Sequence, residues 1–284
     1  METLAALAHR LPPLAFNAFK LTNGLILLAI LLVPLEKVFS LRPQRVFREG
    51  FRTDIGYYFL NSLLPNWVLA LPMALLALGL QRLGLSPFHM WVAGLPLWLR
   101  FAAALLVAEI GFYWGHRWMH QSATLWRFHA IHHGPSSMDW LVNTHAHPVD
   151  LVFVRLCGYV PLYLIGLARV AGNRIDWAPL LVALVGSIWG YFIHANLRLR
   201  FGWLEHIVAT PAFHHWHHCK AESSQGHANY APMLPWVDRL FGTFHLDRIN
   251  WPDAYGIDEK PANGLFVQLR QPFLPLAPRE EGRL

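Results

Sequence analysis

The sequence predicts an all-α, polytopic membrane protein: a bundle of membrane helices with a cytoplasmic, histidine-rich helical cap. Three observations predict this fold. The 284 residues are 55% hydrophobic and 14% charged, with a mean hydropathy of +0.31, outside the range of ordinary soluble domains. Apolar stretches near the ~20 residues that cross a bilayer recur along the chain. Fourteen of the seventeen histidines lie between His116 and His227.

The first apolar stretch covers about residues 11–35 and contains Lys20. Glu36-Lys37 follows it without a small-residue cleavage signature, so we expect a retained membrane anchor. The next segment is basic and should be cytoplasmic by the positive-inside rule. Its cations are Lys37, Arg42, Arg45, Arg48 and Arg52. The second and third apolar stretches run from about 55 to 80 and from about 91 to 114.

Two further apolar stretches, about 151–170 and 177–193, flank a link containing Gly172, and the first of them contains Arg155. We expect a hairpin that either crosses the bilayer or dips into it. If the stretches pair as hairpins, every polar block except the tight turns lies on the side of the basic segment. Three regions follow: 1–100, membrane spans and basic segment; 101–250, the histidine-rich domain; and 251–284, a cytoplasmic tail.

Three histidine motifs occupy the middle region. His116 and His120 close the third apolar stretch at spacing i, i+4, which places both rings on one helical face. The spacing HxxHH begins nine residues after His120 and occurs again from His214. Together the motifs supply His116, His120, His129, His132, His133, His214, His217 and His218.

Eight histidines are too many for one metal ion. A structural zinc takes four ligands and a catalytic zinc three, so eight imidazoles predict two metals with five or six positions each. Zinc offers no redox chemistry, and imidazole suits iron equally well. Because bound imidazoles must be neutral, metal loading should weaken as the pH falls through the histidine range.

These motifs resemble those of the fatty acid hydroxylase/sterol desaturase superfamily of membrane di-iron enzymes, most closely its bacterial and alkylglycerol monooxygenase-like branches. The resemblance extends from about Glu109 to Thr243. It includes Tyr113-Trp114-x-His116-Arg117-x-x-His120, Leu125-Trp126-x-x-His129, Phe192-Ile193-His194, Thr210-Pro211-x-x-His214, Asn229-Tyr230 and Asp238-Arg239-Leu240-Phe241-Gly242-Thr243. It implies two iron ions, O₂ as co-substrate, and hydroxylation of an acyl, alkyl or sterol chain in lipid metabolism. Desaturation by the same site is the alternative.

The chain departs from the family pattern in several places. Ala231 stands where relatives usually have glycine, Val237 separates a tryptophan from Asp238-Arg239, and His145 stands where bacterial relatives often have arginine. The His-Pro-Gly-Gly haem motif of cytochrome b5-fused members does not occur in the sequence. We therefore expect a separate electron donor: a ferredoxin, a cytochrome b5-like protein, a reductase or a pterin.

Other polar residues are further candidates. The resemblance implies that His194 is a ninth ligand, the alternative being a histidine bonded at a helix end. Glu109, on the helical face of His116, would accept an N–H from a ligand or pair with an arginine such as Arg100 or Arg155. His215 should point away from the metals. The remaining candidates are His147 (ligand or partner of a ligand), His145 (substrate contact or loop residue), Asn229 (partner of a ligand or of metal-bound water), and Asp150 and Asp238 (caps or partners of ligands).

Other classes of protein fit the sequence less well. The Lys and Arg residues are dispersed beside apolar runs, which argues against nucleic acid as a partner, and two cysteines provide no disulfide framework. A haem protein or a metal transporter would place its ligands within the spans, whereas most histidines here follow them. A hydrolytic di-zinc membrane enzyme is the remaining rival. The sequence does not predict the oligomeric state.

Overall fold

The computed structural model describes residues 12–169, 175–220 and 228–275. Within these ranges it contains α-helices, short 3₁₀ helices and two isolated β-bridges, which confirms the predicted all-α class. The α-helices are α2 (Pro13–Val38), α3 (Phe51–Arg82), α4 (Ser86–Gly94), α5 (Leu97–Gln121), α6 (Ala123–His132), α7 (Pro148–Leu164), α8 (Trp177–His194), α9 (Pro211–His217), α10 (Pro235–Leu240) and α11 (Leu265–Arg270). The 3₁₀ helices are η1 (Trp140–Thr144), η2 (Gly202–His206) and η4 (Gln271–Phe273).

Four of the described helices are long and apolar enough to cross a membrane: α2, α3, α5 and α8. Large apolar side chains on their surfaces, such as Leu71, Leu78 and Ile188, are exposed, as expected for helices that face lipid. The chain is therefore an integral, multi-pass membrane protein.

Two predicted stretches differ from the observed helices. The stretch at 91–114 is divided, because Pro96 lacks the N–H that would continue α4 and instead precedes the first turn of α5. The stretch at 151–170 ends early: α7 stops at Leu164, and Gly166 follows with a φ of +75°. At 17 residues, α7 is shorter than the helices that could span. The link expected around Gly172 lies outside the described residues.

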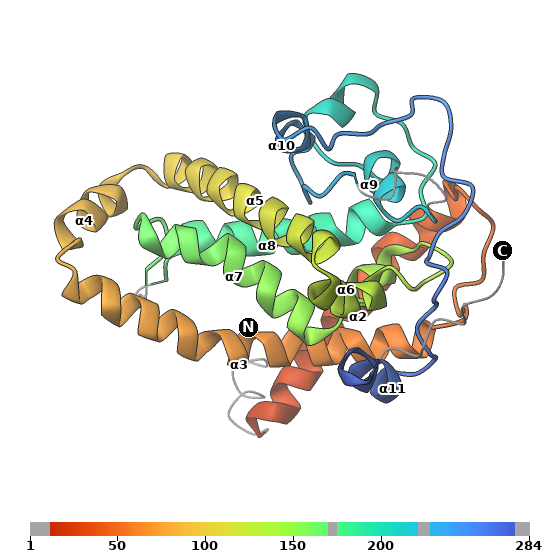
Figure 1. The fold of residues 1–284 in the computed structure, drawn as a ribbon, viewed down its shortest axis with the longest axis horizontal. Helices are drawn as coiled ribbons and strands as arrows, with labels where there is room; N and C mark the ends of the chain where they lie inside the picture. The colour runs from red at the N-terminus through yellow and green to blue at the C-terminus, as the bar shows by residue number, and fades with distance from the viewer. Residues whose placement is uncertain (1–11, 170–174, 221–227, 276–284) are drawn as a thin grey trace.

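Helices α3, α5, α7 and α8 form the bundle, with α4 at one end and the short helices at the other (Figure 1). Helices α5 and α7 are in close contact because Gly111 has no side chain. A Cβ added there would lie 2.2 Å from the carbonyl oxygen of Cys157. Small residues permit such close approach between membrane helices.

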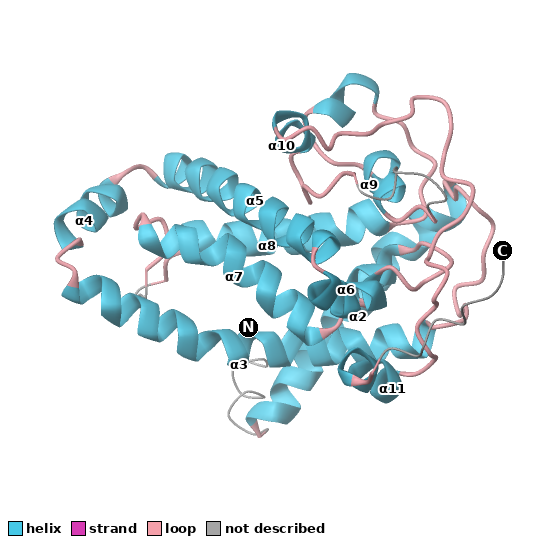
Figure 2. Cartoon of the chain, in the orientation of Figure 1, coloured by secondary structure: helices cyan, strands magenta, loops and turns pink. Residues whose placement is uncertain are grey.

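The cap contains α6, α9 and α10 and long loops, shown in pink in Figure 2. The last turns of α5 and α8 and the first turn of α7 lie at this end of the bundle (Figure 1). All three histidine motifs therefore meet in the cap or at its junction with the bundle.

Candidate metal centre

Nine histidines form two groups. Within each group, every residue has one ring nitrogen that lies within 4.8 Å of a ring nitrogen of every other member. The five-histidine group is His116, His120, His129, His133 and His217. The four-histidine group is His132, His194, His214 and His218. These nine are the residues expected from the three motifs together with the ninth candidate, His194.

Helical geometry explains how the motifs are divided. Residues i and i+4 lie on the same face of a helix, whereas the residue at i+3 points to one side of that pair. His129 and His133, at the end of α6, share the five-histidine group, and His132 between them joins the other. In α9 the arrangement is reversed: His214 and His218 share the four-histidine group, and His217 joins the first.

Backbone carbonyls fix the protonation of four of these rings. Nδ1 of His116 lies 2.8 Å from the Tyr230 oxygen, and Nδ1 of His217 lies 2.8 Å from the Ala228 oxygen. In the four-histidine group, Nδ1 of His132 lies 3.0 Å from the His145 oxygen and Nδ1 of His194 lies 2.7 Å from the Gly190 oxygen. A carbonyl can only accept, so each Nδ1 carries the proton and each Nε2 presents a bare lone pair in the neutral ring.

The Nε2 atoms face one another inside each group. In the five-histidine group, His133 Nε2 lies 3.2 Å from His129 Nε2 and 3.1 Å from His217 Nε2. In the four-histidine group, His194 Nε2 lies 3.3 Å from His132 Nε2 and 3.1 Å from His214 Nε2. The carbonyl contacts leave no proton at Nε2 of His132 and His194, so these two nitrogens cannot hydrogen-bond to each other, and their facing lone pairs suit a shared cation. The residues present therefore fit metal ions.

The two groups are adjacent but distinct. The rings of His133 and His218, one from each group, stack with centroids 4.5 Å apart. Burial lowers the pKa of His132 to about 3 and holds those of His133, His214, His217 and His218 well below 6.5. The rings are therefore neutral at physiological pH, which is the form that binds metals.

Asp150 orients one ring of the five-histidine group. Its Oδ2 lies 2.8 Å from Nδ1 of His129, and both side chains are buried. Burial raises the pKa of Asp150, but the neighbouring His129 outweighs burial and holds it below its usual value. The carboxylate is thus ionised and accepts the Nδ1 proton, an arrangement that fixes a ligand ring and increases its basicity.

Asp238 and Asn229 hold the chain that packs beside the centre. Asp238 accepts the backbone N–H groups of Tyr230 and Ala231 at 2.8 and 2.9 Å. Asn229 has a φ of +62°, and its amide donates to the carbonyl of Phe213 at 2.8 Å. Both residues therefore support the loop whose Tyr230 carbonyl orients His116, and neither belongs to a histidine group.

The other candidates lie outside both groups. Oε1 of Glu109 accepts the backbone N–H groups of Met233 and Leu234 at 2.7 and 2.6 Å, instead of the expected histidine or arginine. His147 Nδ1 accepts the N–H of Val149 at 3.1 Å as the N-cap of α7. His215 lies outside both groups, as expected: Nε2 donates to the carbonyl of Ala195 and Nδ1 accepts from the Tyr255 hydroxyl.

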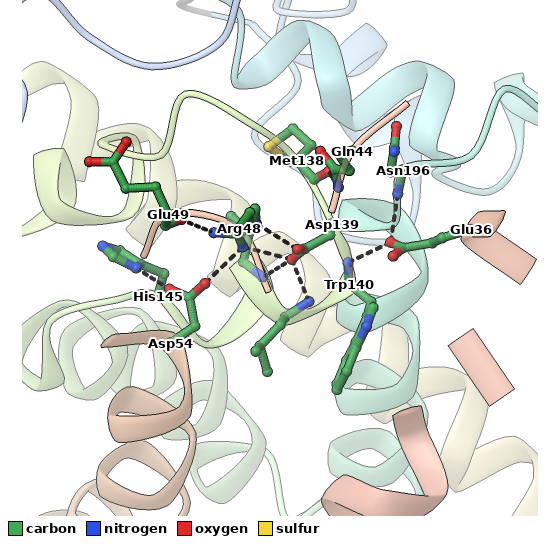
Figure 3. Close-up of polar contacts among 12 residues, drawn as sticks. Glu36, Gln44, Arg48, Glu49, Asp54, Met138, Asp139, Trp140, His145 and Asn196 are labelled. Atoms are coloured by element: carbon green, nitrogen blue, oxygen red, sulfur yellow. Dashed lines mark hydrogen bonds and ion pairs between the residues drawn. The ribbon is translucent and has the colours of Figure 1, made fainter. Parts of the chain in front are cut away.

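A buried ionic network, drawn in Figure 3, connects to the four-histidine group through the carbonyl of His145. The guanidinium of Arg48 bonds to Asp139 at 2.6 Å and to Asp54 at 2.7 Å, and Asp54 also accepts from Nδ1 of His145. The His145 carbonyl in turn receives the Nδ1 proton of His132. The basic segment, which we interpreted only as a topology signal, thus supports a candidate ligand.

Glu36 provides a second link in Figure 3. Its Oε1 accepts the backbone N–H groups of Trp140, at the start of η1, and Asn196, two residues after His194, each at 2.8 Å. This role could not be expected from the sequence, because the partners are backbone amides more than a hundred residues away.

A cavity of about 500 Å³ lies among α3, α5, α7 and α8, within the range of ligand pockets. His116 forms part of its wall, so it adjoins the five-histidine group. Leu105, Phe112 and Val154 supply apolar surface, and Arg155 supplies a charge. An apolar chain can therefore approach the candidate metal centre from within the bundle.

Comparison with known proteins identifies the family. A family model described as fatty acid hydroxylase matches residues 101–243. Ornithine lipid hydroxylase OlsE of Rhizobium tropici is 34% identical over 267 residues, which cover 91% of this chain and 75% of that protein. The alkylglycerol monooxygenases of Danio rerio and Homo sapiens are 30% and 29% identical over 54% and 55% of the chain, and these matches cover 31% and 32% of those proteins. No solved structure matches. The chain therefore belongs to the fatty acid hydroxylase family, as its motifs predicted, and is a membrane hydroxylase of that family with two histidine groups able to bind metal.

Proposed function

We propose that the protein holds one iron ion in each histidine group and uses O₂ to hydroxylate a membrane lipid. The observation that carries this proposal is the pair of adjacent groups in which bare Nε2 atoms converge. Nine imidazoles exceed what one ion can bind, and imidazole suits iron. The family of the chain favours iron over zinc.

Bound iron would supply the redox chemistry: O₂ inserts one atom into a C–H bond, and the other leaves as water with two protons and two electrons. The electrons would come from a separate donor, a ferredoxin, cytochrome b5-like protein, reductase or pterin. The chain itself orients the ligands through Asp150 and the backbone carbonyls. Its cavity would place the lipid beside His116 and exclude water from it.

The histidine groups would face the cytoplasm. Arg42 and Arg48 of the basic segment bond to Asn196 and Asp139, so this segment lies at the same end of the bundle as the histidines. Basic segments beside spans favour the cytoplasmic side. Single cysteines placed in this segment should react with a membrane-impermeant thiol reagent after lysis and not in intact cells; labelling in intact cells would reverse the orientation.

Hydroxylation, as opposed to desaturation, is supported by the relatives, which are an ornithine lipid hydroxylase and alkylglycerol monooxygenases. The test compares lipids from cells that express wild-type protein, His132→Ala, or no protein, with His206→Ala as a control outside both groups. We expect a lipid that gains one oxygen with the wild type and the control and not with His132→Ala. A loss of two hydrogens would indicate a desaturase, and unchanged lipids would overturn the proposal.

A further inference from the structure

The cavity beside His116 contains a cation that the proposed chemistry does not use. Among the described residues of its wall, Arg155 is the one Lys or Arg. We propose that its guanidinium binds the anionic head group of the lipid, a carboxylate or a phosphate, so that oxygen is inserted near the head group. This inference rests on the proposed function and adds the class of substrate and the position of attack.

The wall of the cavity combines two kinds of surface. Leu105, Val154 and Val182 provide apolar contacts for a hydrocarbon chain. Asn143, Ser187 and Tyr191 provide polar atoms in the same cavity as Arg155. An amphiphile fits such a lining better than a plain hydrocarbon does, because its head group can bond to the polar atoms while its chain covers the apolar ones.

Arginine is suited to this role by its chemistry. The guanidinium remains charged at all physiological pH values and presents a planar fork of donors that matches a carboxylate or phosphate in two parallel hydrogen bonds. A charge inside a membrane bundle is expensive and marks a substrate or ion pathway by default.

The position of Arg155 along α7 sets the position of attack. Asp150, in the first turn of α7, bonds to His129 of the five-histidine group. Arg155 is five residues further along the helix, a rise of about 7.5 Å. An anion held by Arg155 therefore lies on the order of 10 Å from the five-histidine group along the helix axis. The carbons that reach this group would then lie nearer to the head group than to the methyl end of a long chain.

The cavity also extends away from the histidines, which leaves room for the hydrocarbon end of the lipid. The cavity wall on α5 extends from His116 back to Leu105, eleven residues or about 16 Å along the helix. On α8 it extends from Tyr191 to Val182. A hydrocarbon chain directed along these walls leads away from the histidines, so its methyl end would not be the site of oxidation.

Binding to the metal-free, full-length protein in lipid nanodiscs tests the head-group site without turnover. The probes are N-palmitoylglycine, its methyl ester, which has no charge, and palmitoyl lysophosphatidic acid. We expect Arg155→Gln to weaken binding of at least one acidic probe by about tenfold or more, the usual loss for a charge-assisted hydrogen bond. Binding of the ester should change less than twofold. Arg155→Lys should retain part of the affinity, and Arg82→Gln, an exposed arginine at the end of α3, should resemble the wild type.

Two binding results would overturn the proposal. One is equal affinity of the wild type for the glycine conjugate, its ester and the phosphate. The other is an Arg155→Gln variant that loses ester and acids to the same extent, since that result would assign Arg155 a purely structural role. The preferred acid decides between a carboxylate and a phosphate head group.

Fragmentation of the oxidised lipid by mass spectrometry tests the position of attack. We expect the new oxygen in the head group or on the first chain carbons; oxygen near the methyl end would overturn this part of the proposal. Arg155-dependent binding by a protein that oxidises no lipid would remove the proposed function and leave the head-group site standing. Oxidation that is independent of Arg155 would support the proposed function and overturn the head-group site.

Discussion

Replacing Asp150 should weaken metal binding in the five-histidine group while leaving the fold in place. In Asp150→Asn the amide oxygen can still accept the Nδ1 proton of His129, but the charge is lost. A hydrogen bond to a charged group contributes about 1.5–3 kcal/mol and a neutral one about 0.5–1.5 kcal/mol. The difference of about 1–1.5 kcal/mol corresponds to roughly tenfold in affinity. Asp150→Ala removes the acceptor and should cost about 10–100-fold.

Competition with a chelator measures this effect. Purified variants are titrated with an iron chelator of known affinity, and the iron that remains per chain is determined by elemental analysis. Asp253→Asn, an exposed residue, is the matched control. We expect the affinity for iron to decrease from the wild type and the control to Asp150→Asn and then to Asp150→Ala. Only the ion of the five-histidine group, half of the total iron, should be affected. Chelator curves that coincide for all four proteins would refute the role of Asp150 in orienting His129.

Three further predictions concern stability. Arg48→Met removes the cation that neutralises the buried carboxylates of Asp54 and Asp139, and should lower the unfolding free energy by about 3–5 kcal/mol. An unchanged Tm would contradict the role of this network. Gly111→Ala places a Cβ 2.2 Å from a carbonyl oxygen of α7 and should lower the unfolding free energy by about 1–3 kcal/mol. Gly79→Ala, with open space around it, is the control and should have no such effect. Equal Tm values for the two variants would show that α5 and α7 separate freely. Burial lowers the pKa of five histidines below 6.5: His132, His133, His214, His217 and His218. Because the unfolded chain then binds more protons, the metal-free protein should lose up to about 1.4 kcal/mol of stability per histidine and pH unit as the pH falls below 6.5. A Tm that is constant from pH 7.5 to 5.5 would contradict this last expectation.

The sequence predicted which histidines gather, because their spacing is local. An i, i+4 pair shares a face of any helix, so His116 and His120 are close whatever the rest of the chain does. The division of the nine between two groups was not predicted. It depends on how α6 and α9 are rotated against each other, and the HxxHH spacing is the same in both.

Partners in distant segments were the other features that the sequence did not indicate. Glu109 was expected beside a ligand because it shares a helical face with His116, but that face also meets the backbone of residues 233–234. Arg48 and Asp139 are ordinary charges in the sequence, ninety-one positions apart. Only the arrangement of the helices brings such pairs together. The break at Pro96 was readable from the chain, since proline cannot continue a helix through its N–H.

The most direct test of the central claim is the metal content of the purified full-length protein and of two single variants. His217→Ala removes a member of the five-histidine group, and His194→Ala removes a member of the four-histidine group. We expect about two iron ions per chain in the wild type without a haem Soret band, and about one in each variant. Stoichiometric zinc, haem, a single ion in the wild type, or variants that each retain both ions would contradict a di-iron centre divided between the two histidine groups.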